Sequence, residues 1–125
     1  MEETLRRLPD SELAVMQAIW HSEAPVDARK IRTALGEDCT LATTTVLTLL
    51  TRLAEKRYIC IEKDGRRSVY TPLVAEKDYQ TGQSRRLFDQ LFGGSVSAFA
   101  SALCEGGLSP AELAELRKLL EEERL

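Results

Sequence analysis

The sequence predicts a mainly α-helical fold with one small β-hairpin, and three observations support this class. Apolar side chains recur with the helical period of 3.6 residues in several segments. Proline, glycine and hydroxyl residues stand where those segments would begin or end. Asp64-Gly65 separates two runs rich in β-forming residues, 58–63 and 66–72, and such a dipeptide is a strong hairpin signal. With 125 residues, the chain has room for one small domain and an appended helical element.

Two helices are expected before residue 37. The first follows Pro9 and gathers its apolar side chains on one face, namely Leu13, Met16, Ile19 and Trp20. Residues 22–25 are typical of a turn. Asp27 should then cap a short helix that Gly36 ends in a left-handed conformation.

Segment 41–56 requires a choice between strand and helix. Five threonines and Val46 favour a strand by propensity alone. The spacing of Val46, Leu49, Leu50 and Leu53, however, is that of one helix face, and about fourteen residues without a breaker is long for a strand. We therefore expect a third helix whose opposite face carries threonines and Arg52.

The remainder of the chain is expected to be helical after Pro72, which ends the second strand. One helix should cover residues 76–92 and stop at Gly93-Gly94, and Ser95 should cap a second that Gly106-Gly107 ends. Residues 109–112, Ser-Pro-Ala-Glu, form a capping box with proline at the first helical position, so they open a final helix.

Charge is unevenly distributed along the chain. The formal net charge of −3 gives no hint of nucleic-acid binding. Residues 29–72 nevertheless hold nine basic against five acidic side chains, a net +4, between acidic ends. A basic middle that contains the third helix and the hairpin is a modest electrostatic footprint for DNA.

Several classes of function are disfavoured by what the sequence lacks. The single histidine, His21, is expected to be a surface residue at a helix end, because no nucleophile and acid accompany it, so an enzyme is not expected. Cys39, Cys60 and Cys104 lack metal-site spacing and suggest reduced thiols in a cytoplasm, with no metal and no cofactor. No apolar run is long enough to insert into a membrane, and no secretory signal is visible.

Three helices followed by a two-stranded wing are the plan of a winged helix-turn-helix module, whose third helix enters the major groove of double-stranded DNA. Threonine hydroxyls suit phosphates or base edges, and their methyl groups suit thymine. Wing arginines suit a phosphate or the minor groove. The candidate DNA-binding residues are Thr43, Thr44, Thr45, Thr48, Arg52, Lys56, Arg66 and Arg67. The alternative is a winged-helix module that binds a partner protein, which the basic wing disfavours.

We expect a DNA-binding domain at residues 1–74 and a helical dimerisation domain at 75–125. The second part exposes more apolar surface than a small winged helix can cover, and a second copy would bury it while placing two third helices on successive turns of DNA. The alternative is that the tail packs on its own domain. The candidate interface residues are Leu87, Phe88, Leu91, Phe92, Val96, Phe99, Leu103, Leu113, Leu116 and Leu120.

Nearly the whole chain resembles the BlaI/MecI/CopY (penicillinase-repressor) family. The segments that carry the resemblance are 12–16 with 19–20 (ELAVM, IW), 44–53 (TTVLTLLTRL), and 65–66 with 70–72 (GR, YTP). The resemblance implies a homodimeric winged-helix repressor of a dyad-symmetric operator, with DNA contacts from the third helix and wing and dimer contacts from the C-terminal helices.

The chain also departs from that family. Thr43 replaces a frequent aromatic or proline, so operator sequence does not carry over, and Arg57 replaces a usual glycine, which would add a phosphate contact. The paired CxC motifs of the copper-responsive branch are absent, so copper sensing is not expected. The antibiotic-responsive branch is inactivated by a membrane sensor-protease. Its cleavage site would fall at Ala102-Leu103, but the familiar asparagine-phenylalanine pair is missing there. A thiol switch at Cys104 is the less favoured alternative.

Overall fold

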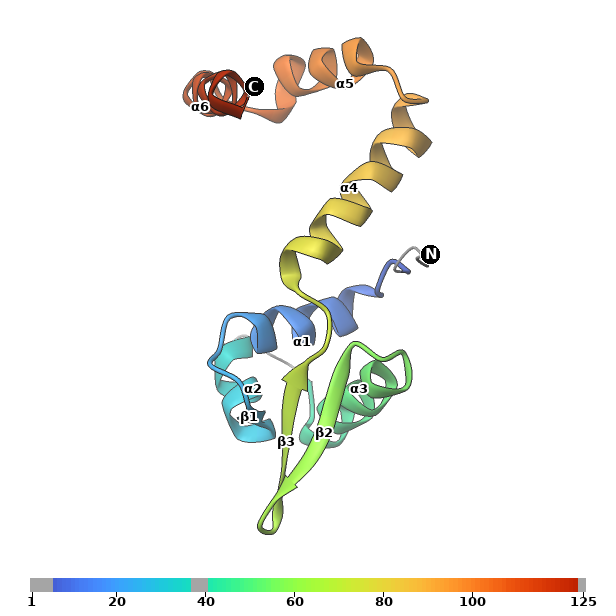
Figure 1. Ribbon diagram of the computed structural model, residues 1–125, viewed down its shortest axis with the longest axis vertical. Helices are drawn as coiled ribbons and strands as arrows, with labels where there is room; N and C mark the ends of the chain where they lie inside the picture. The colour runs from blue at the N-terminus through green and yellow to red at the C-terminus, as the bar shows by residue number, and fades with distance from the viewer. Residues whose placement is uncertain (1–5, 37–40, 124–125) are drawn as a thin grey trace. The chain divides into compact units, whose positions relative to one another are not determined.

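The computed structural model describes residues 6–36 and 41–123 and divides the chain into two compact units, Met1–Gln83 and Ser84–Leu125. The first unit contains α1 (Asp10–Trp20), β1 (Val26–Asp27), α2 (Ala28–Leu35), α3 (Thr43–Glu55), β2 (Ile59–Asp64) and β3 (Arg67–Pro72) (Figure 1). Helix α4 (Glu76–Phe92) begins in it and continues into the second unit. The second unit also holds α5 (Val96–Ala102), the π-helical turn η1 (Leu103–Gly107) and α6 (Pro110–Glu123). The prediction of a mainly helical chain with a small sheet is confirmed.

Helix α2 begins and ends at the residues that the sequence indicated. The carboxylate of Asp27 accepts a hydrogen bond from the Lys30 backbone N–H at 2.9 Å, which satisfies one of the free donors at a helix start. Gly36 follows the helix with φ 93° and ψ 170°. This positive φ confirms the left-handed conformation expected of Gly36. Its ψ is extended rather than helical, so the chain turns away from the helix in a region open almost only to glycine.

Helix α3 forms despite its threonines, because burial of one apolar face outweighs β-propensity. Val46, Leu49, Leu50 and Leu53 are buried at helical spacing. At its C-terminal end the N–H groups of Arg57 and Tyr58 donate to the carbonyls of Ala54 and Leu53, the hydrogen-bond pattern of a Schellman motif. Arg57 has φ 67°, a left-handed conformation that favours glycine.

The sheet has three antiparallel strands in the order β1-β3-β2, so the expected two-stranded hairpin was incomplete. Strand β1 has only two residues, which pair with Tyr70 and Val69, and so short a strand leaves no alternation of apolar side chains to detect. The turn is also displaced by one residue from the expected position. Asp64 pairs with Arg67, so the two turn residues are Gly65 and Arg66, with the positive φ of 68° at Gly65.

The core of the first unit lies between the three helices and the sheet. Its fully buried side chains are Leu8, Val15, Met16, Ile19, Val26, Ile31, Val46, Leu50, Leu53 and Ile59. The first turn of α4 belongs to this core through Tyr79, whose ring contacts Trp20 and Tyr58 and whose hydroxyl accepts the Leu8 backbone N–H at 2.9 Å. Trp20 lies partly buried at the core edge, where its indole N–H donates to the Val74 carbonyl.

The second unit has well-formed helix caps but no buried side chain within the described residues 84–123. The hydroxyl of Ser95 accepts the Ala98 N–H, as predicted. The predicted capping box is also confirmed, since Ser109 and Glu112 exchange hydrogen bonds of 2.8 and 3.1 Å. Phe99 packs edge-on against Phe88 and Phe92, which holds α5 against the end of α4. Local hydrogen bonds thus define these helices, while their apolar faces remain open.

Candidate nucleic-acid interface

Helix α3 presents a polar face to solvent. Exposed side chains on it include the candidates Thr43, Thr44, Thr45, Thr48 and Arg52. The Thr48 hydroxyl donates to the Thr44 carbonyl at 3.0 Å, so its oxygen is left to accept a hydrogen bond and its methyl group to make apolar contacts. Leu47 adds an exposed apolar side chain to the same helix. Hydroxyl, methyl and guanidinium groups on one exposed helix can read the donors, acceptors and thymine methyls of a major groove.

The two wing arginines differ in their surroundings. Arg66 lies in the β2–β3 turn, exposed, and makes no ion pair within the described part of the chain. Arg67, the next residue, donates to the carboxylates of Asp27 at 2.7 Å and Asp64 at 3.2 Å. Only Arg66 therefore presents an unengaged guanidinium at the wing tip.

Asp27 connects the helix-turn-helix to the wing. One carboxylate oxygen accepts the Lys30 N–H and the other accepts Arg67. The Lys30 backbone hydrogen bond lowers the pKa of Asp27 below its ordinary value, against the opposing effect of burial, and the charges of Arg67 and Lys30 lower it further. The carboxylate is therefore ionised at neutral pH, and it holds β3 beside the start of α2.

A shallow hollow of about 270 Å³ lies where α2, α3 and β3 meet. Asp27, Arg29, Leu47 and Arg67 line it, together with Ala28, Ser68 and Tyr70. The hollow places side chains of α3 and of the wing on one continuous surface. It also brings in Arg29, a residue outside the predicted set.

Lys56 is engaged with the protein itself. Its ammonium group lies 2.5 Å from a carboxylate oxygen of Glu12, whose side chain is 3 % exposed. The ion pair joins the residue that follows α3 to the first turn of α1. Lys56 thus lies close to the predicted surface, but its charge is used to neutralise a buried acid.

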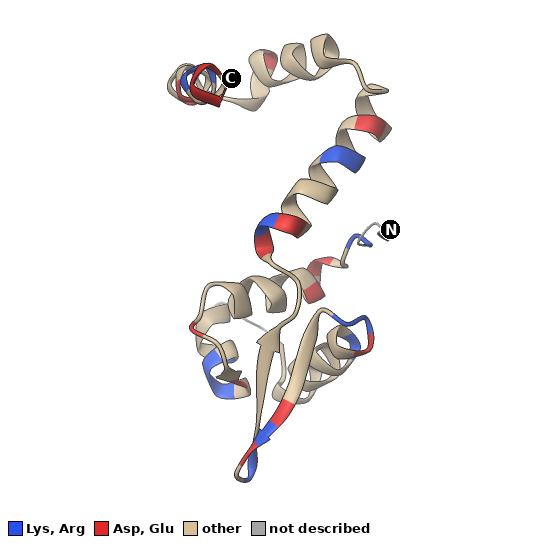
Figure 2. Cartoon of the chain, viewed as in Figure 1, with Lys and Arg blue, Asp and Glu red and all other residues tan. Residues whose placement is uncertain are grey.

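Basic side chains on α2 were missed as candidates. Figure 2 shows Lys and Arg on α2 and at the wing tip. Arg29 and Lys30 are exposed in the first turn of α2, whereas Arg32 donates to the Leu41 carbonyl before α3. Their position directly after the Asp27 cap was the signal in the sequence. Helix α2 is the first helix of the helix-turn-helix pair, and in such modules this helix crosses the backbone of the bound DNA.

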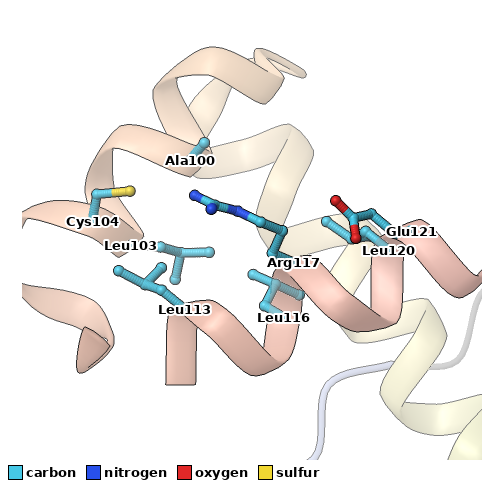
Figure 3. Close-up of a pocket in the computed structure, with 8 residues that line it drawn as sticks. All are labelled: Ala100, Leu103, Cys104, Leu113, Leu116, Arg117, Leu120 and Glu121. Atoms are coloured by element: carbon cyan, nitrogen blue, oxygen red, sulfur yellow. The ribbon is translucent and has the colours of Figure 1, made fainter. Parts of the chain in front are cut away.

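The second unit contains an open apolar groove of about 750 Å³ (Figure 3). Four predicted interface residues line it, Leu103, Leu113, Leu116 and Leu120, beside Ala100, Cys104, Arg117 and Glu121. Three others are in ring contact, because Phe99 packs edge-on against both Phe88 and Phe92. The remaining three, Leu87, Leu91 and Val96, are 51 %, 66 % and 71 % exposed. The described part of the second unit therefore leaves an extended apolar surface exposed to solvent.

The residues considered for regulation lie in the same unit. Ala102 is the exposed last residue of α5, and Leu103 begins η1. Cys104 is exposed and Cys60 is partly buried, while Cys39 lies outside the described residues. Between residues 6 and 123, without 37–40, no group of three or more His, Cys, Asp or Glu side chains could hold a metal ion. His21 is exposed, as predicted, and lies 3.0 Å from a Glu76 carboxylate oxygen.

No single helix in the described ranges is long and apolar enough to cross a membrane. Helix α4 and the α5–η1 stretch reach the length and hydropathy of a membrane span only when they are taken together, and the chain is sharply bent between them.

A three-helix core, a short antiparallel sheet and a polar third helix beside a basic turn define a winged-helix DNA-binding protein. Comparison with known proteins agrees. Residues 8–122 match the penicillinase repressor family, and the chain belongs to this family of transcriptional repressors, which are not enzymes. It is 30 % identical over 119 residues to the penicillinase repressor of Bacillus licheniformis, which covers 94 % of this chain and 92 % of that protein.

Other relatives carry the same assignment. The chain is 27 % identical over 121 residues to the methicillin resistance regulatory protein MecI of Staphylococcus aureus, covering 96 % of this chain and 98 % of MecI. The solved DNA-binding domain of the repressor BlaI aligns with a TM-score of 0.52 at 33 % identity, over 63 % of this chain and 94 % of that one. A second structure, monomeric Bacillus licheniformis BlaI in complex with the blaP half-operator, aligns with a TM-score of 0.50 at 33 % identity. The alignment covers 60 % of this chain and 90 % of that one. The predicted family and fold class are confirmed.

Proposed function

We propose that the chain is a homodimeric repressor that binds a dyad-symmetric DNA operator, one half-site per copy, through α3 and the wing. The exposed apolar surface of residues 84–123, which contain no buried side chain, carries the proposal of a dimer. A second copy of the same surface would remove the apolar groove from water and would set two α3 helices about one DNA turn, or a multiple of it, apart. The half-operator bound by monomeric BlaI supports recognition of one half-site by one copy.

Within each copy, we assign the base contacts to the N-terminal half of α3, from Thr43 to Thr48, and phosphate contacts to Arg52 and Arg66. These side chains are exposed, and neither arginine has an ion pair among the described residues. Lys56 and Arg67 are held by carboxylates in the free protein, and we assign them to the structure of the module.

The test of DNA recognition uses the full chain and a pool of randomised duplexes. Selection should enrich an inverted repeat, because two identical copies related by a dyad read identical half-sites. Arg66→Ala should then reduce the slope of log K against log salt by about 0.9, the value expected for one phosphate contact. Lys118→Ala is the control, since it removes one positive charge from an exposed site on α6 that lies outside the groove lining. Failure to enrich any sequence would overturn the proposal in favour of a module that binds proteins.

The test of the dimer uses analytical ultracentrifugation. Leu116→Lys places a charge in the groove and should yield monomers at micromolar concentration. Leu119→Lys is the matched control, because Leu119 is on the same helix, 50 % exposed and outside the groove lining. A monomeric wild-type chain at this concentration would contradict the proposal.

Release from DNA by cleavage at Ala102–Leu103 is the regulatory route that we propose. This bond joins α5 to η1, and both flanking residues have helical backbone, with φ near −60°. A protease that binds its substrate in extended form would have to unwind this turn first. Cells exposed to a candidate inducer should contain a shortened product, and an intact band during derepression would exclude this route.

A further inference from the structure

We propose that Asp27 is a specificity-determining residue of the DNA interface because it holds Arg67 on the protein and withholds that cation from the DNA backbone. This inference rests on the proposed function of α3 and the wing as the DNA-binding face.

Arg67 is held by two carboxylates of the protein, of which Asp27 is the stronger partner. Arg67 has the same chemistry as Arg66 and a side chain that is 60 % exposed, so by itself it would be a second phosphate ligand on the wing. Its Nη1 instead donates to Asp27 at 2.7 Å and its Nη2 donates to Asp64 at 3.2 Å. The two carboxylates are unequal partners, since the Asp27 side chain is 15 % exposed and that of Asp64 is 63 % exposed. Asp27 is the less hydrated of the two and holds the arginine more firmly.

The ion pair of Asp27 and Arg67 lies on the proposed DNA-binding face. Asp27 and Arg67 both line the hollow beside Leu47 of α3, so they lie between the third helix and the wing. A phosphate that approaches Arg29 or Arg67 there meets the negative charge of Asp27 as well. Because Asp27 also caps α2 through the Lys30 N–H, its carboxylate is fixed in place and cannot swing aside without uncapping the helix.

The consequence concerns the ratio between operator and non-operator binding. Non-specific binding depends almost entirely on phosphate contacts, whereas operator binding adds base contacts from α3. A carboxylate that removes one cation from the backbone contacts therefore weakens binding to any DNA and leaves base reading untouched.

The experiment measures binding of the full chain to operator and to non-operator duplexes over a range of salt concentrations. Asp27→Asn keeps a side chain that caps helices but removes the charge that holds Arg67. We expect the salt slope for non-operator DNA to steepen by about 0.9, one additional phosphate contact. The affinity for that DNA should rise by about two- to fivefold, the effect of one exposed charge pair.

Two further variants separate this mechanism from simpler ones. Glu62→Gln removes one negative charge from exposed β2 without touching Arg67 and should leave the slope unchanged. The double variant Asp27→Asn with Arg67→Gln should lose the gain. If Asp27 serves only to brace the wing, Asp27→Asn will weaken binding with no steeper slope, and the inference is wrong. If the wild-type chain fails to bind any selected duplex, the proposed function fails first and independently.

Discussion

The ion pair between Glu12 and Lys56 predicts an asymmetry between two substitutions. The Glu12 side chain is 3 % exposed, whereas that of Lys56 is 37 % exposed. Lys56→Met would leave a buried carboxylate without its counter-charge, while Glu12→Gln would leave an ammonium group that water can still reach. The first change should therefore cost more stability than the second.

The magnitudes follow from the geometry. Two unit charges 2.5 Å apart attract by about 6–7 kcal/mol at an effective dielectric constant near 20, and dehydration of the buried carboxylate offsets several kcal/mol of this. Lys56→Met should lower the free energy of unfolding by about 3–5 kcal/mol, as when one partner of a buried pair is removed. Glu12→Gln removes a charged hydrogen bond, but water can then hydrate the Lys56 ammonium group. The free energy of unfolding should therefore fall by only about 1–2 kcal/mol.

Urea unfolding followed by the fluorescence of Trp20, the single tryptophan, reports on the first unit alone. Lys77→Met is the control, since Lys77 is an exposed lysine in the first turn of α4. Equal losses for Lys56→Met and Glu12→Gln, or a larger loss for Glu12→Gln, would refute the reasoning from burial.

Four further predictions concern the first unit. Tyr79→Phe leaves the buried Leu8 N–H without its acceptor and should cost about 1–3 kcal/mol in the same urea assay, and no change would show that water replaces the hydroxyl. Arg57→Gly relieves a left-handed residue at φ 67° and should stabilise by about 0.5–1 kcal/mol, whereas Arg57→Ala should not. Gly65→Val should destabilise the wing by about 1 kcal/mol or more because its φ is 68° while no atom crowds the site, and an unchanged midpoint would contradict this backbone argument. Because the folded-state pKa of Asp27 is lowered, its contribution to stability is complete above its ordinary value of 3.8 and is lost as pH falls through the lower folded value. The acid limb of the unfolding midpoint should therefore be shallower in Asp27→Asn than in the wild type.

Helix boundaries and the wing could be predicted because each depends on local chemistry. The Asp27 cap, the capping box at Ser109 and the apolar stripe of α3 are all encoded within four to eight residues. Strand β1 could not be predicted, because two residues acquire strand geometry only from pairing with β3. The register of the turn could not be predicted either, because Asp64-Gly65 and Gly65-Arg66 are both acceptable turn pairs and only the pairing of the two strands selects one of them.

The candidate interface was predictable by residue type but not by pairing. The threonines and arginines were expected to be exposed, and they are. That Arg66 is unengaged while Arg67 and Lys56 meet acids depends on Asp27 and Glu12, which lie 40 and 44 residues away in sequence. Ion pairs of that separation leave no periodic pattern, so only the folded chain reveals which cations remain for DNA.

The absence of buried side chains from residues 84–123 has a consequence for the abundance of the protein. A segment without a core gains little free energy from folding alone, so in a dimer its order would increase with the concentration of the chain by mass action. Newly made copies at low concentration would then present loosely held helices to cellular proteases, and paired copies would be protected. The lifetime of such a repressor would rise with its own amount, and a cell that dilutes it below the dimer threshold would clear it quickly.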